Sequence, residues 1–217
     1  MNNIKQPRLL YDHNVEKSSC GVGFITKKDS KQTHDLIIKA NEALCSVPHR
    51  GGMSSEGIGD GAGISIDLSV NFFSKITNKT LKFGDFVVGN FFMPKNKVYK
   101  IKANNLIINT LENSGFKLIK SRDVPVNKSV LNKFSQSSQL TIKQFIFSMQ
   151  NTSDKNIDKS IYRCLLDIEA VAFRDKNLEE LYPLSLSRKL QVLKGRLKSN
   201  EIIPYFKAVS YTHLRAH

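Results

Sequence analysis

Residues 49–66 read HRGGMSSEGIGDGAGISI, the most glycine-dense stretch of the chain. It contains six of the 12 glycines in the chain, so we expect its backbone to turn sharply or to approach another segment closely. Residues 57–62 also satisfy a loose G-x-G-x-x-A dinucleotide pattern. In a dinucleotide fold that motif follows a strand and opens a helix, whereas here the strand-like residues 64–66 come after the glycines. A dinucleotide-binding fold is therefore not expected.

Strands and helices are predicted on both sides of this stretch. Short apolar runs rich in β-branched residues indicate strands, and apolar residues recurring every three or four positions indicate helices. The predicted strands are 20–25, 64–66, 86–93, 116–119 and 142–149, with a hairpin of 183–187 and 191–195 and a turn-bearing segment at 122–126; the predicted helices are 34–44, 106–114, 158–173 and 201–207. The run 86–93 is apolar throughout, which is typical of a strand buried on both faces. The pattern is that of an α/β or α+β protein.

The chain has 217 residues, which suits one medium-sized domain or two very small ones. Hydrophobic residues make up 40% and charged residues 24%, so collagen-like, disordered and coiled-coil proteins are excluded. No apolar run approaches the roughly 20 residues of a membrane span, and residues 1–19 lack the apolar core of a secretory signal. Three scattered cysteines (Cys20, Cys45 and Cys164) do not suggest a disulfide framework. We therefore predict a cytoplasmic protein.

The formal net charge is +14, from 33 Lys and Arg against 19 Asp and Glu. Such a surplus favours contact with nucleic acid or anionic membranes. The lysines are spread singly along the chain, however, and only 8 of the basic residues are Arg, the type preferred for bidentate phosphate and base contacts. We therefore predict a solvated basic surface, with neither nucleic acid nor membrane as a partner.

Cys20 is the strongest candidate for chemistry. A cysteine at the start of an apolar strand is usually a small core residue. Gly21 and Gly23 leave the backbone open to a substrate, however, and the preceding residues 16–19 are polar enough to be exposed to cleavage. A cut between Ser19 and Cys20 would give the thiol a neighbouring α-amino group with a pKa of about 7.7–8.0. Nucleophile and base would then belong to one residue.

The residues around Cys20 and the glycine-rich stretch resemble a known family. Cys20-Gly-Val-Gly-Phe-Ile25, His49-Arg-Gly-Gly52 and Gly59-Asp-Gly-Ala-Gly-Ile64 are similar to segments of the class II glutamine amidotransferases, and more narrowly of the N-terminal glutaminase domain of glutamate synthase large chains. Further similar segments follow in order at 10–12, 72–73, 115–116, 122–126 and 182–195. An ordered series from about residue 10 to about residue 207 is more specific than any single motif.

The resemblance implies an α+β fold, the αββα sandwich of the N-terminal nucleophile hydrolases. It implies that residues 1–19 are a propeptide and that mature Cys20 attacks the side-chain amide of L-glutamine. A γ-glutamyl thioester would form, ammonia would leave, and water would release glutamate. In the full-length enzyme the ammonia would meet 2-oxoglutarate at a flavin site. FMN, an iron–sulfur cluster and a small subunit or ferredoxin are expected for the full-length protein, and no cofactor for these 217 residues.

The resemblance also assigns roles around the nucleophile. Pocket support would come from Gly21, His49 and Arg50, and a glycine loop from Gly59, Asp60, Gly61 and Gly63. From the residues alone, Arg50 also suits a surface ion pair with Glu56 or Asp60, His49 suits packing, and Asp60 suits side-chain-to-backbone bonds within the loop. Cys45 and Cys164 are expected to be core thiols. No metal site is expected, because Cys45 and His49 lack a second ligand pair for tetrahedral zinc.

The resemblance stops before the glutamine site is complete. The family's Arg-Phe-Ser-Thr segment, expected to hold the substrate carboxylate, and its Asn-Gly-Glu segment, expected to form the oxyanion hole, do not occur in the chain. Residues 209–217 read VSYTHLRAH and resemble a translated sequencing adaptor. We therefore expect residues 20–208 to be about the first half of the amidotransferase domain and the chain alone to be inactive.

Two other functions stay open at the level of sequence. One is a basic binding module in which Cys20 is structural and residues 1–19 remain attached. The other is a different class II amidotransferase, such as an asparagine or glucosamine-phosphate synthase. The polar leader, the run 59–64 and the similarity beyond residue 100 count against the second of these.

Overall fold

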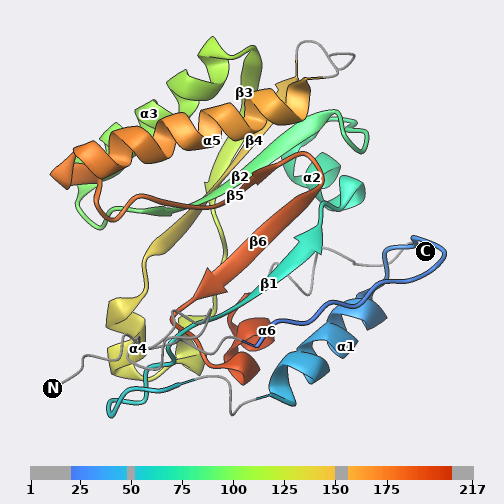
Figure 1. The fold of residues 1–217 in the computed structure, drawn as a ribbon, viewed down its shortest axis with the longest axis vertical. Helices are drawn as coiled ribbons and strands as arrows, with labels where there is room; N and C mark the ends of the chain where they lie inside the picture. Colours follow the sequence, from blue (N-terminus) through green and yellow to red (C-terminus); the bar gives the residue numbers. More distant parts are fainter. Residues whose placement is uncertain (1–20, 48–51, 150–155, 207–217) are drawn as a thin grey trace, which may run out of the picture.

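The computed structural model describes residues 21–47, 52–149 and 156–206. The helices are α1 His34–Cys45, α2 Val70–Thr77, α3 Lys97–Asn113, α4 Lys133–Ser138, α5 Ile157–Arg174 and α6 Ile202–Tyr205. The strands are β1 Ala62–Asp67, β2 Phe86–Met93, β3 Phe116–Asp123, β4 Thr141–Met149, β5 Tyr182–Ser187 and β6 Leu190–Gly195. Figure 1 shows them arranged as two antiparallel sheets with α3 and α5 packed together on one side. The mixed content and antiparallel pairing confirm the α+β class.

Strands β2 to β5 form a four-stranded sheet in the order β3-β4-β2-β5, in which every neighbouring pair is antiparallel. Helix α3 connects β2 to β3, and α5 connects β4 to β5. This β-α-β-β-α-β order, with each helix spanning one intervening strand, is that of a ferredoxin-like unit. Both helices pack on the same face of the sheet and share one core with it.

The core between the sheet and its two helices is built from alternate strand residues. Val87, Phe91 and Phe145 pack there with Ile107 of α3 and Ile168 of α5, and all five side chains are fully buried. The other face of β2 is buried as well, so the predicted strand 86–93 with two buried faces is confirmed. Burial of each such side chain contributes about 1.5–3 kcal/mol, which makes this core a main source of stability.

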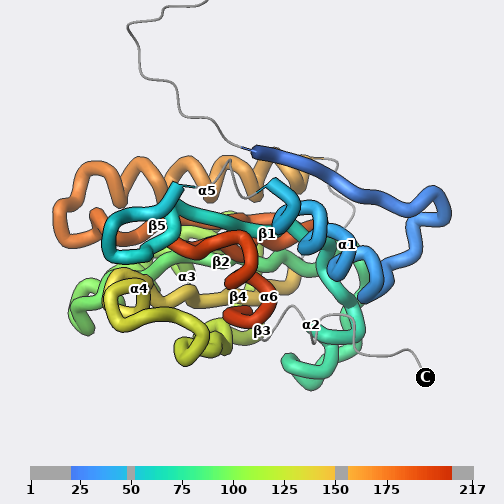
Figure 2. Tube along the Cα trace, turned by 90° about the horizontal axis from the view of Figure 1, so that it is seen from below, coloured from blue at the N-terminus to red at the C-terminus, as the bar shows by residue number. Residues whose placement is uncertain are grey.

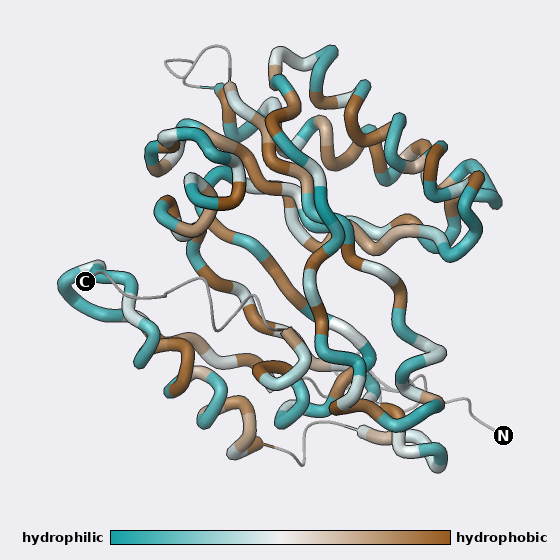
Figure 3. Tube along the Cα trace, turned by 180° about the vertical axis from the view of Figure 1, so that it is seen from behind, coloured by the Kyte–Doolittle hydropathy of each residue, from teal (hydrophilic) through white to brown (hydrophobic). Residues whose placement is uncertain are grey.

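The second sheet is a ribbon of β1 and β6, paired antiparallel from Ala62 opposite Gly195 to Asp67 opposite Leu190. The ribbon contributes to a second core, on the face of the four-stranded sheet away from α3 and α5. That core contains residues of both ribbon strands, of β4, of α1 and of α6: Ile66, Leu193, Ile142, Ile37 and Ile202. The layers therefore run from the helix pair through the sheet and the ribbon to α1. Figure 3 shows hydrophobic and hydrophilic residues alternating along the helices, as expected for helices buried on one side.

The predicted hairpin of 183–187 with 191–195 is wrong. Both segments are strands, but β5 pairs with β2, and β6 pairs with β1. The chain turns between the two sheets after Ser187, whose hydroxyl oxygen accepts hydrogen bonds from the backbone N–H groups of Lys189 (3.0 Å) and Leu190 (3.4 Å). Leu186 of β5 is buried in the core under α5, and Leu193 of β6 is buried in the second core, against which Leu184 on the other face of β5 also packs.

The predicted strand 20–25 is also wrong over its described part. Residues 21–25 pair with no described strand, and the side chains of Val22 and Phe24 are 94% and 92% exposed. Alternating apolar residues favour an extended chain, but a strand also needs a neighbouring backbone to complete its hydrogen bonds. Figure 1 draws this segment as an extended trace that leads into α1.

Helix α3 is longer than the predicted helix 106–114. It begins after Asn96, whose side-chain oxygen accepts hydrogen bonds from the N–H groups of Val98 (2.8 Å) and Tyr99 (3.2 Å). The apolar pattern does not indicate these first turns, because Val98 and Ile101 are mostly exposed. Helices α2 and α4 are likewise not predicted, and β3 continues to Asp123, into the predicted turn segment. The remaining predicted helices and strands form, with shifted ends.

Candidate functional site

Residues 52–61 form a small antiparallel hairpin, here called the glycine hairpin, which leads into β1. Met53 and Gly59 form an isolated β-bridge, and the N–H of Ser54 donates to the carbonyl oxygen of Ile58 at 2.9 Å. At the open end, the N–H of Asp60 donates to the carbonyl oxygen at position 52 over 3.0 Å. These bonds hold the glycine-rich stretch in a defined conformation before it enters the ribbon.

The tip of the glycine hairpin is a tight turn held by α4. Gly57 has φ +77°, a left-handed conformation that glycine adopts without steric cost, and its N–H donates to the carbonyl oxygen of Ser54 at 2.9 Å. The side-chain amide of Asn132, at the start of α4, donates to the carbonyl oxygens of Glu56 (3.1 Å) and Gly57 (3.5 Å). Figure 2 shows the hairpin and α4 side by side at one end of the molecule.

Gly59 is needed because another backbone passes directly beside it. A Cβ atom at this position would lie 2.5 Å from the carbonyl oxygen of Leu197 and 2.7 Å from the backbone nitrogen of Lys198. Real Cβ atoms do not make such short contacts, so a side chain here would push the two segments apart. Leu197 is itself buried in the second core. The glycine hairpin is thus packed against the chain that leaves β6.

The other predicted loop residues lie where the hairpin becomes a strand. Asp60, Gly61 and Gly63 are exposed, and Gly63 pairs with Lys194 in the ribbon. The Asp60 carboxylate lies directly against Gly52, so that a side chain at position 52 would require this exposed carboxylate to move aside. Gly59, Asp60 and Gly61 therefore belong to the glycine hairpin, and Gly63 belongs to β1.

The predicted nucleophile and two pocket residues are not placed. Cys20, His49 and Arg50 lie outside the described residues, and Gly21 is the first described residue and is exposed. Gly52, against which Asp60 lies, follows Arg50 by two positions in the sequence. The roles of these residues, and the alternative surface ion pair of Arg50, stay predictions.

A buried polar network joins the two sheets, and the sequence analysis does not identify it. Asn90 of β2, Gln144 of β4 and Gln191 of β6 are each at most 2% exposed. The Gln144 amide donates to the side-chain oxygens of Asn90 (2.9 Å) and Gln191 (3.0 Å), and the Asn90 amide donates to the Val192 carbonyl oxygen at 3.0 Å. The available signal is the presence of polar residues inside otherwise apolar strands, because buried amides must be hydrogen-bonded.

Arg122 extends this network toward α2. Its Nε donates to the Gln144 side-chain oxygen at 2.9 Å, and its guanidinium carbon lies 5.1 Å from the centre of the Phe72 ring. Within the described residues its Nη2 is enclosed and has no hydrogen-bond acceptor, so the aromatic ring supplies the compensating interaction. Burial lowers the pKa of Arg122. The segment 122–126, singled out by its family resemblance, thus begins with an arginine that links α2 to both sheets.

The two described cysteines lie in different environments. Cys164 of α5 is buried in the main core, as predicted, and burial raises the pKa of its thiol. Cys45, the last residue of α1, is only half-buried, so the prediction of a core thiol is correct for Cys164 and only in part for Cys45. Among the residues that the structure describes, no three His, Cys, Asp or Glu side chains are grouped as metal ligands would be.

The sequence that forms this fold is similar to those of known proteins. A sequence profile of the class II glutamine amidotransferases matches residues 20–217. The chain belongs to this family. The match covers most of the chain, and its first residue is Cys20.

Curated relatives are glutamate synthases. The chain is 28% identical over 228 residues to the NADH glutamate synthase of Saccharomyces cerevisiae, a match that covers 100% of this chain and 11% of the relative. It is 31% identical over 204 residues to the chloroplastic ferredoxin-dependent glutamate synthase of Spinacia oleracea, covering 91% of this chain and 12% of the relative. It is 27% identical over 202 residues to the NADPH glutamate synthase large chain of Azospirillum brasilense, a match that covers 90% of this chain and 13% of the relative.

These findings confirm the resemblance to the glutaminase part of glutamate synthases. The chain spans only 11 to 13% of the length of these relatives. The similarity therefore concerns one part of a glutamate synthase and does not show the activity of the whole enzyme. Within the described ranges no helix has the length and apolar character to cross a membrane. The predicted leader 1–19 and the predicted tail 209–217 fall in residues that the structure does not describe.

Proposed function

We propose that this chain is the glutaminase part of a glutamate synthase, in which Cys20 hydrolyses the side-chain amide of L-glutamine. The observation that carries the proposal is the family match, which begins at Cys20. A match that starts at Cys20 and leaves out residues 1–19 supports a mature chain that begins with this cysteine. Residues 1–19 would then be a propeptide, and residues 20–208 part of an αββα N-terminal nucleophile hydrolase.

The chemistry requires a nucleophile, a proton acceptor and an oxyanion site. The α-amine of mature Cys20 accepts the thiol proton, and the thiolate attacks the amide carbon to form a tetrahedral oxyanion. The resulting α-ammonium group then gives this proton to the leaving nitrogen, so that collapse of the intermediate breaks the C–N bond, releases ammonia and leaves a γ-glutamyl thioester. Water then attacks the thioester, glutamate leaves, and the thiol is restored. His49, Arg50 and the glycine hairpin support the pocket in this proposal; the rigidity of the hairpin, held by Asn132 and packed against Leu197, is consistent with a pocket wall.

An iron–sulfur cluster does not fit the described residues. An iron–sulfur cluster is held by several cysteine thiolates. The two described cysteines, Cys45 and Cys164, lie on different helices, and Cys164 is enclosed in an apolar core. We assign FMN, the cluster and the contact with a small subunit or ferredoxin to other parts of the longer protein. Ammonia released at Cys20 would be consumed there in the reductive amination of 2-oxoglutarate.

The 217-residue chain alone is proposed to be inactive. It contains neither an Arg-Phe-Ser-Thr nor an Asn-Gly-Glu segment. Loss of one oxyanion donor costs about 10²–10³ in rate, and an unclamped substrate is not positioned for attack. Residues 209–217 are proposed to be adaptor-derived.

The test uses the longest polypeptide that the source gene encodes. Its intact mass and N-terminal sequence are expected to show a mature chain that begins at Cys20. Glutamine hydrolysis is expected to fall at least about 10³-fold in Cys20→Ala, since the nucleophile is lost, and to be unchanged in the control Cys45→Ala. A chain that retains residues 1–19, with equal hydrolysis in the two variants, would favour the basic binding module instead.

A further inference from the structure

Helix α4 is hydrogen-bonded to three segments that lie far apart in the sequence. Asn132, directly before the helix, donates through its side-chain amide to two carbonyl oxygens at the tip of the glycine hairpin. Gln139, directly after the helix, donates over 2.8 Å to the carbonyl oxygen of Arg196, in the chain that leaves β6. The carbonyl oxygen of Ser137 accepts a hydrogen bond at 2.8 Å from Nζ of Lys95, just beyond β2. A helix of six residues thus ties the glycine hairpin and the end of the ribbon to the four-stranded sheet.

The tip of the glycine hairpin depends on α4 for its position. At the base, Ile58 and Gly59 are buried, and Gly59 lies against the backbone of Leu197. At the tip, Glu56 is exposed, and within the described residues the Asn132 amide supplies the hydrogen bonds that join the tip to another element. Exposed segments with few buried contacts open locally at low cost, so a hairpin held only at its base would pivot there. Asn132 therefore sets the orientation of the hairpin.

The two polar atoms of the Asn132 side chain have separate tasks. Oδ1 accepts a hydrogen bond from the N–H of Ser135 at 2.7 Å and so caps α4, whereas Nδ2 donates to the hairpin. Asn132→Asp keeps the capping oxygen but removes the donor, and it turns a carboxylate toward carbonyl oxygens. Because Asn132 is exposed, this change leaves both cores intact. It releases the tip of the hairpin without removing the helix that holds it.

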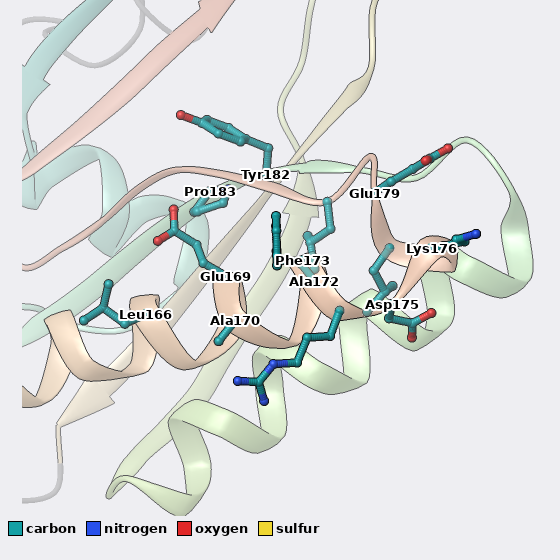
Figure 4. A pocket seen from close by; sticks show the side chains of 13 residues that line it. Leu166, Glu169, Ala170, Ala172, Phe173, Asp175, Lys176, Glu179, Tyr182 and Pro183 are labelled. Atoms are coloured by element: carbon teal, nitrogen blue, oxygen red, sulfur yellow. The ribbon is translucent and has the colours of Figure 1, made fainter.

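An open groove between α5 and β5 is not part of this arrangement. Figure 4 shows an apolar row on α5, formed by Leu166, Ala170 and Phe173, and on the strand side Tyr182 and Pro183, around a cavity of about 690 Å³. No described residue of α4 or of the glycine hairpin lines this cavity. The groove is therefore separate from the pocket wall that the hairpin provides in the proposed function.

We propose that Asn132 is a positioning residue for glutamine hydrolysis, whose amide holds the glycine hairpin in the orientation in which it forms a wall of the pocket. The inference rests on the proposed function, in which the hairpin supports the pocket of Cys20. When the hairpin keeps this orientation for only part of the time, only that fraction binds glutamine, and the apparent affinity falls accordingly. Bound glutamine selects the assembled pocket, so the rate of the chemical step in the complex is unchanged. Loss of the Asn132 amide thus raises KM and leaves kcat nearly constant.

The first experiment measures hydrogen exchange of residues 53–60 by peptide mass spectrometry, in the longest polypeptide that the source gene encodes. Exchange is expected to be at least about tenfold faster in Asn132→Asp than in the parent, because the hairpin opens more often. The matched control is Asn96→Asp, at the equivalent capping position of α3, where the side-chain oxygen accepts from Val98 and Tyr99. It makes the same chemical change away from the hairpin and is expected to leave this exchange as in the parent.

The second experiment measures the kinetics of glutamine hydrolysis in the same proteins. Asn132→Asp is expected to raise KM at least about tenfold and to change kcat less than about twofold, whereas Asn96→Asp changes neither. Asn132→Ser, which keeps a capping hydroxyl but is too short to reach the hairpin, is expected to raise KM equally and excludes an effect of the added charge.

Two results would overturn the role of Asn132 while the proposed function stands. One is equal exchange of residues 53–60 in Asn132→Asp and Asn96→Asp, and the other is an unchanged KM despite faster exchange. A failure of the proposed function is seen separately, in the parent, as glutamine hydrolysis that does not depend on Cys20. That result would overturn this inference as well, because no reaction would remain for the hairpin to support.

Discussion

Replacement of Gly59 by alanine should destabilise the fold through a single steric contact. The added Cβ would meet the main chain of Leu197 and Lys198 at 2.5–2.7 Å, about 1 Å inside ordinary van der Waals contact. The obstacle is backbone, not the mobile end of a side chain. Because Leu197 is anchored in the second core, the hairpin and the chain after β6 must move apart. Overpacking of this kind costs about 1–3 kcal/mol.

The assay is thermal unfolding followed by circular dichroism. For a chain of this size each kcal/mol lowers the melting temperature by about 2–4 °C, so Gly59→Ala should melt about 2–12 °C below the parent. Gly23→Ala is the matched control, because nothing lies within 4 Å of a Cβ at position 23 and its φ is not positive. Equal melting temperatures for the two variants would refute the close approach of the glycine hairpin to Leu197. If Gly59→Ala yields too little protein for thermal scans, urea unfolding midpoints of its soluble fraction and of Gly23→Ala decide the comparison.

Three further predictions concern the network, an ion pair and the thiols. Gln144→Leu removes the donor shared by two buried amide oxygens and should cost about 1–3 kcal/mol in urea unfolding, whereas Ser65→Ala, at an exposed strand position, should be neutral. The two hydrogen bonds that Arg188 donates to the Asp158 carboxylate lower the pKa of Asp158. The ion pair of Arg188 and Asp158 therefore stabilises the fold above about pH 4, and its contribution disappears as the pH falls through the lowered pKa. Since the pair is largely exposed, Asp158→Asn should lose only about 0.5 kcal/mol at pH 6 and nothing at the acid end, and an unchanged difference across this range would contradict the assignment. Buried Cys164 should react with maleimide at least about tenfold more slowly than half-buried Cys45, and equal rates would mean that the main core opens freely.

Most of the elements could be predicted from the sequence where burial gives a regular pattern. Helix α5 buries Ile161 and Ile168 on one face, and the apolar run of β2 reflects burial on both faces. The wrong or missing predictions fall where burial does not follow a regular pattern along the sequence. The first turns of α3 expose Val98 and Ile101, so no periodicity marks them, and the apolar residues around Phe24 indicate a strand for which the described chain offers no partner.

The candidate site, too, could be predicted from the sequence only in part. The motif residues from Gly59 to Gly63 could be predicted as a special backbone segment, since glycine density is visible in the sequence. That Gly59 is required by Leu197, and Gly57 by a tight turn under Asn132, could not be predicted, because the contacting segments are far apart along the chain. The same holds for the amides of Asn90 and Gln191, which are separated by 101 positions.

Most helices and strands and the family could be inferred from the sequence alone, because hydrophobic spacing, glycine density and the order of motifs are properties of the covalent chain. The tertiary structure alone decided that β5 and β6 enter different sheets, that Arg122 joins α2 to a buried amide network, and that α5 leaves an apolar row beside an open groove. The physical reason is that pairing, close packing and desolvation depend on which distant segments meet. That choice is made by the burial of the whole chain and is not recorded in any short stretch of it.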